Sequence, residues 1–442
     1  MVILHYALGF PPYRTGGLTK FCVDLMHEQM AQGHAVGLLW PGEMQLLGEK
    51  TYIRVGSDIQ GIKNYEVINP TPISYDEGIS DVSCFMKEGD YEYYLSFFQK
   101  HRPDILHVHT LMGLHKAMLT AAKQCNVKLV FTTHDFYPIC PKVTLFRGGQ
   151  VCPTVGSCQN CTACNTSALP MWKVMILQSP LYRILKDSAL VKKLRKGHRD
   201  QYFKDATAET PLADGDGGAY KKLRHYYESL IQMMDVIHYN SSVTRMVYQT
   251  YMQITDGVLI PISHKDVVDK RREKTFSDKE LRITYMGQQS GAKGYFILKD
   301  AMDQVYSQAE HARLNIFFEP MESAPYLNVH GRFAYCDLEK IFERTDVLVA
   351  PSIWYETFGY TVLEALSYGV PVVISSNVGA QDILPAGAGI IVENINAQNL
   401  ASTLLQLTPQ KLEEMNRIIL QRMRISTMSD VAQKIEESCY CK

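Results

Sequence analysis

The segment Asp346-Val-Leu-Val-Ala-Pro351, followed closely by Glu356-Thr-Phe-Gly-Tyr-Thr-Val-Leu-Glu364, decides how the chain is interpreted. It predicts a buried strand, a short polar loop and a helix. Gly359 lets the backbone approach a ligand, and the free N–H groups that open the helix form an anion site. Glu356 and Glu364 stand on either side of that site, where each could accept hydroxyl groups. A nucleotide-sugar has this layout of sugar, pyrophosphate and ribose, so the segment predicts a site for that class of ligand.

The same alternation of apolar strands and amphipathic helices recurs along the chain. We expect strands at residues 2–8, 35–39, 105–109, 128–133, 236–240, 281–286, 314–319, 347–350, 370–375 and 389–392. Such alternation is typical of parallel sheets with helices on both faces, and 442 residues exceed one typical core. The sequence therefore predicts an α/β protein of two doubly wound, Rossmann-like domains facing a central cleft, with the ligand at the C-terminal ends of the strands.

The domain boundaries follow from breaks in this pattern. The first domain is expected over residues 1–262, interrupted at about 140–235 by a cysteine cluster and a basic helical stretch. A charged segment then leads into the second domain, expected over residues 263–425. Residues 426–442 are expected to form a C-terminal helix that crosses back to the first domain.

The composition is that of an ordinary globular protein. Hydrophobic residues make up 46% of the chain, and 45 basic residues against 46 acidic ones give a net charge of −1. This balance gives no indication of a nucleic-acid partner. No apolar run approaches the roughly 20 residues that span a bilayer, and the opening Met1-Val-Ile-Leu-His-Tyr6 lacks the basic region of a signal peptide. We therefore expect a cytosolic location.

Two more strand ends carry residues that suit a phosphate ligand. Gly16-Gly17 follows the first expected strand and opens a helix, where the backbone can approach a phosphate or an acceptor. Gly287-Gln-Gln-Ser-Gly-Ala-Lys293-Gly294 follows the strand at 281–286. A lysine in such a loop can neutralise charge that develops on a leaving phosphate. An exposed loop lysine is the plainer alternative.

Histidines mark the edge of the first expected sheet. His134-Asp135 ends the strand at 128–133, where an imidazole could bond a sugar hydroxyl, pass on a proton, or simply cap the strand. His107 and His109 alternate along another strand. We expect them to face opposite ways and to be structural.

Taken together, these features resemble the retaining glycosyltransferases of family 4, which have the GT-B fold. The resemblance rests on Gly16-Gly17, His134-Asp135, the Gly287…Lys293-Gly294 loop, and Glu356…Glu364 followed by Ala365-Leu-Ser-Tyr-Gly-Val-Pro-Val. It covers both ends of the chain and is weaker in the middle. The resemblance implies that the donor binds mainly to the second domain and the acceptor to the first.

The resemblance also implies roles for single residues. Glu356 would contact sugar hydroxyls near the reacting centre, Glu364 the ribose, and Lys293 the leaving diphosphate. Family members usually carry an arginine directly after the first glycine of the lysine loop, but this chain has Gln288, so one cation of the usual pair is missing. The implied catalytic residues are Glu356, His134 and Lys293. The implied donor-binding residues are Gly16, Gly17, Gln288, Phe358, Gly359, Tyr360, Thr361 and Glu364.

As to activity, the resemblance implies a hexosyltransferase that uses a nucleotide-diphosphate sugar. The expected mechanism is same-face substitution, in which the departing phosphate helps to deprotonate the acceptor and no catalytic metal is needed. The expected acceptor is a lipid-linked glycan in bacterial surface polysaccharide biosynthesis, at the inner face of the membrane.

Five of the eleven cysteines fall in one short stretch of the insertion. They are Cys140, Cys152, Cys158, Cys161 and Cys164. In a cytosolic chain such clusters are more often thiols or metal ligands than disulfides, and four thiolates can close a tetrahedral zinc site. An iron–sulfur cluster, a redox disulfide and scattered core thiols are the alternatives. One of the five thiols would be spare, and Cys140 and Cys164 are the candidates. A subset of family 4 resembles this stretch, which implies a structural metal that holds the loop beside the acceptor cleft.

The stretch 172–204 that follows is basic, with nine Lys or Arg against two Asp. Ser179-Pro180 is a plausible helix start. An apolar stripe would then consist of Leu181, Ile184, Leu185, Val191 and Leu194. A basic amphipathic helix can lie on an anionic membrane surface, and an ordinary packed helix with a solvated face is the alternative.

Two rival classes of function are compatible with the same fold. A sugar-nucleotide epimerase would need acid/base carboxylates in the first domain, which the sequence does not identify. A non-catalytic subunit that binds a glycan or a transferase would account for Gln288.

Overall fold

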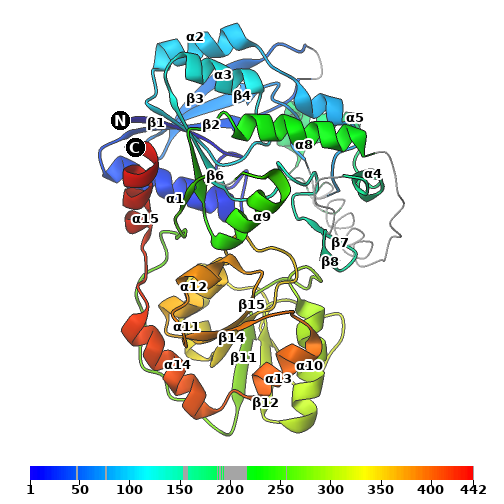
Figure 1. The fold of residues 1–442 in the computed structure, drawn as a ribbon, viewed down its shortest axis with the longest axis vertical. Coiled ribbons are helices and arrows are strands. Elements are labelled where there is room, and N and C mark those ends of the chain that lie inside the picture. The colour runs from blue at the N-terminus through cyan, green and yellow to red at the C-terminus, as the bar shows by residue number, and fades with distance from the viewer. Residues whose placement is uncertain are drawn as a thin grey trace.

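The computed structural model describes residues 1–45, 48–74, 77–152, 158–186, 217–254 and 256–441, together with residues 188, 191 and 193. These residues form two α/β domains stacked end to end (Figure 1). Each domain contains a sheet of mainly parallel strands with helices on both faces. The predicted fold class is therefore confirmed.

The first sheet has eight strands in the order β10-β9-β6-β5-β1-β2-β4-β3, all parallel except the edge strand β3. Their bounds are β1 Val2–Tyr6, β2 Ala35–Pro41, β3 Tyr52–Ile59, β4 Ile62–Ile68, β5 Ile105–Val108, β6 Lys128–Thr133, β9 Val236–Tyr239 and β10 Val258–Leu259. The hairpin of β3 and β4 has no counterpart among the expected strands. Its outer strand is half exposed, so it lacks the apolar run that marks the buried strands.

Helices cover both faces of the first sheet. Helices α2 (Tyr91–His101), α3 (Lys116–Gln124), α8 (Gly218–Ile231) and α9 (Ser242–Met252) pack on one face. Helix α1 (Gly17–Ala31) covers the other face, where Phe21 and Leu25 pack against Ile3, Ile105 and Val130. A 3-10 turn, η1, spans Val82–Met86.

The second sheet has six parallel strands in the order β13-β12-β11-β14-β15-β16. Their bounds are β11 Leu281–Tyr285, β12 Ala312–Ile316, β13 Leu327–Val329, β14 Val347–Ala350, β15 Val372–Ser375 and β16 Gly389–Val392. Strand β12 lies two residues before the expected position, because Phe317 and Phe318 already belong to the following bend. The remaining elements are α10 Tyr295–Gln308, η2 Tyr335–Asp337, α11 Leu338–Glu343, α12 Tyr360–Ser367, η3 Gly379–Ile383, α13 Ala397–Leu405 and α14 Pro409–Arg422.

After α14 the chain returns to the first domain. Helix α15 (Met428–Ile435) and the π-turn η4 (Glu436–Tyr440) lie beside α1, as the red and blue ribbons in Figure 1 show. Val431, Ala432 and Ile435 enter the same apolar cluster as Phe21 of α1. This C-terminal segment therefore covers part of the first sheet although it follows the second domain in sequence.

The insertion contains β7 Phe146–Arg147, β8 Gln150–Val151, α4 Cys161–Cys164, α5 Met171–Leu177 and α6 Pro180–Leu185. Helix α6 starts at the predicted place, with Ser179 as its N-cap and Pro180 at its first position. It ends at Leu185, and Leu194 of the expected apolar stripe lies outside the described residues. Asp214-Gly-Asp216, which we interpret from sequence as a polar turn, also lies outside them.

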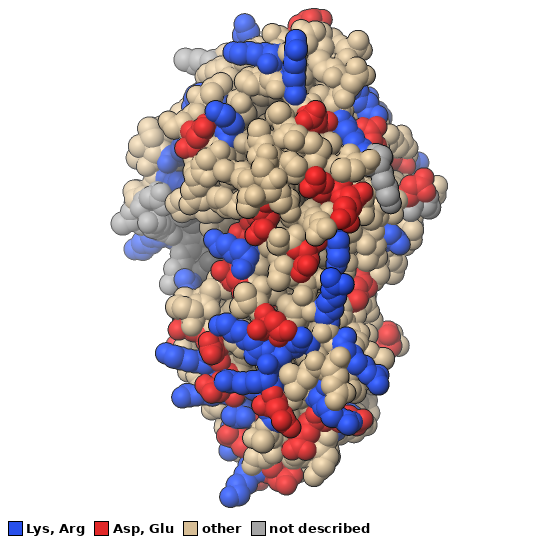
Figure 2. Space-filling model, turned by 90° about the vertical axis from the view of Figure 1, so that its left-hand side faces the viewer, with Lys and Arg blue, Asp and Glu red and all other residues tan. Residues whose placement is uncertain are grey.

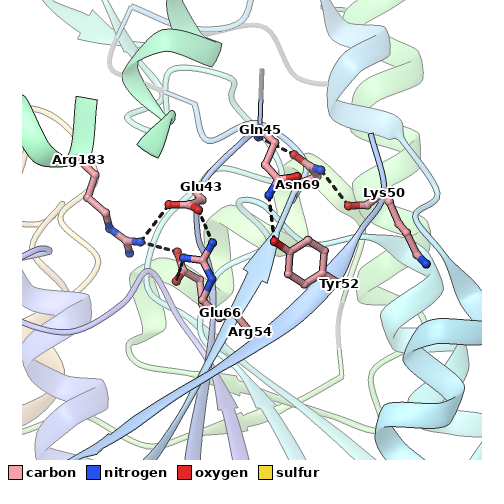
Figure 3. A network of polar contacts seen from close by, with 8 residues as sticks. All are labelled: Glu43, Gln45, Lys50, Tyr52, Arg54, Glu66, Asn69 and Arg183. Atoms are coloured by element: carbon pink, nitrogen blue, oxygen red, sulfur yellow. Dashed lines mark hydrogen bonds and ion pairs between the residues drawn. The ribbon is translucent and has the colours of Figure 1, made fainter. Parts of the chain in front are cut away.

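Arg183 joins α6 to the first sheet (Figure 3). Its guanidinium lies 2.8 Å from Glu66 Oε1 and 3.4 Å from Glu43 Oε2, and Arg54 of β3 contacts both carboxylates from the other side. Burial raises the pKa of Glu66, and the two arginines act in the opposite direction. Two cations therefore balance two nearly buried carboxylates and tie the insertion to the edge of the first domain.

Charged side chains on the surface are interspersed and of both signs. On the face shown in Figure 2, they crowd the lower, second domain, whereas large uncharged areas cover the first domain. Within the part of the chain that the structure describes, no helix has the length and apolarity required to cross a membrane.

Candidate functional site

A cleft of about 610 Å³ lies between the two domains. Both domains line it through the loops that follow β1, β6, β11 and β14. Of the predicted site residues, Gly17, His134, Gln288, Lys293, Glu356, Phe358, Gly359, Tyr360 and Thr361 line this cleft. The structure thus brings together in one cavity residues that are up to 344 positions apart in the sequence (17 to 361).

Three helices around the cleft begin at glycines with left-handed backbone. Gly16, Gly294 and Gly359 are the N-caps of α1, α10 and α12, with φ of 118°, 76° and 101°. A Cβ at Gly294 would lie 1.9 Å from the carbonyl oxygen of Pro351, so only glycine fits there. A Cβ at Gly17 would lie 3.3 Å from the ring of Tyr360. The starts of α1 and α12 therefore face each other across the cleft, and their free N–H groups favour an anionic ligand.

Lys293 and Glu356 form an ion pair inside the cleft. Trp354 donates its indole N–H to Glu356 Oε2 over 3.0 Å, and the Lys293 ammonium lies 4.8 Å from the centroid of the Trp354 ring. Burial alone would raise the pKa of Glu356, but Lys293 and the hydrogen bonds from Trp354 and Ser352 outweigh it and lower the pKa. Glu356 is therefore an ionised hydrogen-bond acceptor at neutral pH.

The loop that carries Glu356 is held in place by a neighbouring segment. The Glu356 N–H donates to the carbonyl of Asn377 over 2.9 Å, and its own carbonyl accepts from the N–H of Gly379 at 3.0 Å. The N–H of Ala380 donates to the carbonyl of Phe358 over 2.6 Å. These bonds fix the backbone before α12, so the carboxylate and the helix start keep a constant relative position.

Glu364 lies one turn into α12 and does not line the cleft. It is 5% exposed, and its Oε1 lies 3.0 Å from His264 Nε2. Tyr335 also contacts Glu364 by a hydrogen bond. The predicted contact of Glu364 with a ribose stays a prediction, and the partners of Glu364 in the structure are His264 and Tyr335.

Gln288 lines the cleft at the predicted place. The hydroxyl of Tyr285 donates to the backbone carbonyl of Gln288 over 2.7 Å and fixes the bend after β11. Among the described residues that line the cleft, Lys293 is the sole lysine or arginine. The cleft therefore offers one side-chain cation and several helix starts to an anion.

His134 and Asp135 follow β6 on the opposite, first-domain side of the cleft. Asp135 accepts from the Tyr137 N–H at 3.0 Å and from the Thr110 hydroxyl at 3.5 Å. Burial raises the pKa of Asp135 to about 6, and these hydrogen bonds only partly oppose the shift. Burial lowers the pKa of His134 to about 3, so this ring is neutral at physiological pH.

The expectation for the orientation of His107 and His109 is wrong. Their rings stack with centroids 4.1 Å apart, on the same face of the sheet. Residues two apart in a strand point to the same side, since the side-chain period is two. Both side chains are fully buried, and neither lines the cleft.

The five predicted metal ligands lie together in the insertion. Cys161 hydrogen-bonds to Cys158, and this bond lowers the pKa of Cys158 to about 7. Burial raises the pKa of Cys140 to about 12. Among the described residues, no three of these sulfur atoms lie within 4.8 Å of one another. The donor set suits zinc, but in this conformation the thiols do not form a closed tetrahedron.

Sequence reasoning did not identify Trp354 or Asp135 as site residues. Trp354 stands two positions before Glu356, where its indole can reach the carboxylate, but spacing alone does not indicate that contact. The sequence places Asp135 next to His134, but it does not show that burial at the end of β6 raises the pKa of Asp135.

Comparisons with known proteins agree with this geometry. Residues 15–151 match a family model described as "Glycosyltransferase Family 4", and residues 280–409 match one described as "Glycosyl transferases group 1". A curated relative, "Uncharacterized glycosyltransferase MJ1607" of Methanocaldococcus jannaschii, is 31% identical over 137 residues. That match covers 28% of this chain and 35% of the relative, so it spans about a third of the relative's length.

Several solved structures have the same fold over nearly the whole chain. Sucrose-phosphate synthase of Thermosynechococcus elongatus is 14% identical with a TM-score of 0.57, covering 98% of this chain and 97% of its own. Anabaena Alr3699/HepE in complex with UDP and glucose is 14% identical with a TM-score of 0.54 and full coverage of both chains. Trehalose-phosphate synthase of Burkholderia xenovorans is 11% identical with a TM-score of 0.56, covering 99% of each chain. The chain is therefore a GT-B protein in which each domain carries a match to a glycosyltransferase family model.

Proposed function

We propose that the protein is a retaining glycosyltransferase that moves a hexose from a nucleotide-diphosphate sugar to a glycan acceptor. The observation that carries this proposal is the Lys293–Glu356 pair, which stands in the interdomain cleft beside the starts of α10 and α12. It places a cation suited to a diphosphate next to an ionised carboxylate suited to sugar hydroxyls. The complex of Anabaena Alr3699/HepE with UDP-glucose, which shares the fold, supports the donor class.

In this proposal each residue of the pair acts on a different part of the donor. Lys293 and the N–H groups at the start of α12 stabilise the charge that develops on the departing diphosphate. Glu356 accepts hydrogen bonds from the sugar and holds it in position. Because Lys293 and Glu356 contact each other, donor binding would separate them, with Lys293 contacting the phosphate and Glu356 the sugar.

Same-face substitution is the proposed course of the reaction. The departing phosphate takes the acceptor proton, so no protein nucleophile is required. The alternative is a double displacement through Asp135, a carboxylate on the first-domain side of the cleft. A double displacement would require Asp135 to attack the sugar as a carboxylate.

We further propose that the acceptor is a lipid-linked glycan of bacterial surface polysaccharide biosynthesis, reached at the inner face of the membrane. Five large apolar side chains on α5 and α6 face solvent. They are Trp172, Ile176, Leu181, Ile184 and Leu185, and Ile184 is 78% exposed. Lys173 lies on α5, and Lys186 directly follows α6. Exposed apolar residues beside basic ones suit an anionic lipid surface.

The cysteine loop is proposed to bind a structural zinc ion through four of Cys140, Cys152, Cys158, Cys161 and Cys164. Cys158, whose pKa the hydrogen bond from Cys161 lowers, favours the thiolate form that zinc binds, whereas zinc would have to displace the proton from Cys140, whose pKa burial raises. The metal would close the loop beside the cleft, where Val143 and Thr144 contribute to the lining. It takes no part in the transfer step.

Replacement of Lys293 by methionine tests the proposed donor site. We expect release of nucleoside diphosphate from the preferred donor, chosen from a panel of nucleotide-sugars, to fall about 100-fold, because the leaving group loses its cation. Lys299→Met is the matched control, since Lys299 lies on α10 and pairs with Asp303 and Glu322 outside the cleft. If the unaltered protein releases no nucleoside diphosphate from any donor, even with membrane extract as acceptor, a non-catalytic binding subunit becomes the better interpretation.

The pKa of Asp135 leads to a pH-dependent effect on stability. This pKa rises from 3.8 to about 6 on folding, so the free energy of unfolding falls as the pH rises through that window and is constant above it. Asp135→Asn should therefore stabilise the protein by about 1–2 kcal/mol at pH 7.5, after allowance for partial exposure, with a much smaller gain at pH 4. Thermal unfolding at both pH values measures this. Loss of all transferase activity in the same variant would contradict same-face substitution.

Metal analysis tests the cysteine loop. We expect about one zinc per chain in the purified protein, strongly reduced in a Cys158→Ser, Cys161→Ser double variant. Cys336→Ser, at an exposed cysteine of the second domain, should retain its zinc. A zinc content near zero in the unaltered protein would contradict the proposal.

Vesicle sedimentation tests the membrane surface. A Leu181→Glu, Ile184→Glu double variant should bind vesicles of anionic phospholipid at least about 10-fold more weakly than the unaltered protein, because it loses apolar contact and gains negative charge. Met321→Glu, at a residue that is 70% exposed in the second domain, is the control. Equal binding by all three proteins would show that α5 and α6 do not contact the lipid.

A further inference from the structure

A row of buried polar side chains crosses the first sheet beneath α1 and the C-terminal segment. His5 on β1 stands opposite His107 on β5, and Thr132 on β6 stands opposite His238 on β9. All four side chains have 0% exposure. The faces of parallel sheets are normally apolar, and buried polar groups must be hydrogen-bonded. Each of these four buried side chains therefore needs hydrogen-bond partners within the protein.

The first half of the row begins at a backbone carbonyl. The carbonyl oxygen of Ile260 lies 2.8 Å from His238 Nε2, and His238 Nδ1 lies 2.9 Å from the hydroxyl of Thr132. The same hydroxyl lies 2.7 Å from His107 Nε2. His107 Nδ1 lies 2.7 Å from the hydroxyl of Tyr440, which the C-terminal segment contributes.

The second half of the row leads from Tyr440 to the cleft. Gln29 Nε2 donates to the Tyr440 hydroxyl over 2.9 Å, and Gln29 Oε1 lies 2.7 Å from His5 Nε2. His5 Nδ1 lies 2.9 Å from His109 Nε2, and His109 Nδ1 lies 3.1 Å from His134 Nε2. The row thus ends at the imidazole that lines the cleft.

The carbonyl of Ile260 sets the direction of every bond in the row. A carbonyl only accepts, so His238 carries its proton on Nε2 and accepts from Thr132 on Nδ1. Thr132 then accepts from His107 Nε2–H, and His107 Nδ1 accepts from Tyr440. Burial lowers the pKa of each histidine in the row, so each ring is neutral and has one donor and one acceptor nitrogen.

The same direction of hydrogen-bond donation continues from Tyr440 to His134. Tyr440 donates to His107 and accepts from Gln29, whose Oε1 accepts from His5 Nε2–H. His5 Nδ1 accepts from His109 Nε2–H, and His109 Nδ1 accepts from His134 Nε2–H. The opposite direction would bring the lone pair of His238 Nε2 within 2.8 Å of the Ile260 oxygen, which is repulsive. His134 is left with its lone pair on Nδ1, and no described residue hydrogen-bonds to that atom.

A metal ion is a poor alternative occupant. Nitrogens of His5, His107 and His109 lie within 4.8 Å of one another, as in a three-histidine site. However, His109 stacks on His107 with ring centroids 4.1 Å apart, and its Nε2 already lies 2.9 Å from His5 Nδ1. A metal lies in the plane of each ring that binds it, and stacked rings cannot share such a point. All six ring nitrogens also have hydrogen-bond partners in the row.

We propose that this row, from Ile260 through Tyr440 and Gln29 to His109, fixes the tautomer of His134 so that Nδ1 accepts a hydroxyl group of the ligand in the cleft. The assignment of the tautomer rests on these contacts and on the neutrality of the buried rings. The identity of the ligand hydroxyl as one of the donor sugar rests on the proposed function. Tyr440, Gln29, His5 and His109 are positioning residues, because they act on the ligand only through His134.

Nitrogen-15 NMR of histidine side chains in the ligand-free protein tests the tautomer. We expect His134, assigned by its loss in His134→Gln, to carry its proton on Nε2. Tyr440→Phe removes the hydroxyl that links the two halves of the row, so His134 should become a mixture of tautomers. Thr132→Val should do the same and replaces Tyr440→Phe if that variant does not fold.

Tyr94→Phe is the matched control. Tyr94 is fully buried, and its hydroxyl lies 2.9 Å from His115 Nδ1 outside the row. This variant should leave the His134 signals unchanged. A proton on His134 Nδ1 in the unaltered protein, or an unchanged His134 tautomer in both Tyr440→Phe and Thr132→Val, would overturn the proposal.

Kinetics then separate this proposal from the proposed function. In Tyr440→Phe, kcat/KM for donor cleavage should fall up to about 10-fold, as expected for one misdirected hydrogen bond. Tyr94→Phe should keep the original value. An unaltered protein that cleaves no donor refutes the proposed function, while the NMR result still decides the tautomer. An altered tautomer with unchanged kcat/KM would overturn the claim that Nδ1 accepts a donor hydroxyl.

Discussion

The site depends on the parallel arrangement of the strands that lead into it. In a parallel sheet all C-terminal ends meet at one edge, so the loops after β11 and β14, which are neighbours in the second sheet, project side by side. The Lys293–Glu356 ion pair joins these two loops. The opposing sheet presents the loops after β1 and β6 in the same way. A change in the order of strands in either sheet would separate residues that the chemistry needs together.

The elements that the sequence predicts best are those whose signal is local. The bounds of β6, β14 and β16 agree with the structure because short apolar runs are flanked there by polar or glycine residues. The starts of α1, α10 and α12 could likewise be predicted from their glycines, since glycine favours the left-handed backbone found at these helix starts. The β3–β4 hairpin was not predicted, because a half-exposed edge strand lacks this signal.

What the sequence could not supply are contacts between distant segments. The pairing of Lys293 with Glu356 follows from the adjacency of β11 and β14, and the hydrogen bond from Trp354 depends on the turn before α12. The burial that shifts the pKa of Asp135 arises from the packing of several elements around β6. The stacking of His107 on His109 could have been predicted from the two-residue period of a strand, but their shared partners on α1 and the C-terminal segment could not.

The buried row of histidines shows why such partners matter. Neutral imidazoles carry no net charge across the sheet, but each one passes on the direction of a hydrogen bond, and a single backbone carbonyl at Ile260 is sufficient to set that direction. The link between the two halves is the hydroxyl of Tyr440, which comes from a segment that follows the second domain in sequence. Docking of that segment on the first domain therefore does more than cover apolar surface. It determines which nitrogen of His134 carries the proton, so the hydrogen-bonding character of this side of the cleft depends on the C-terminal segment that contributes Tyr440.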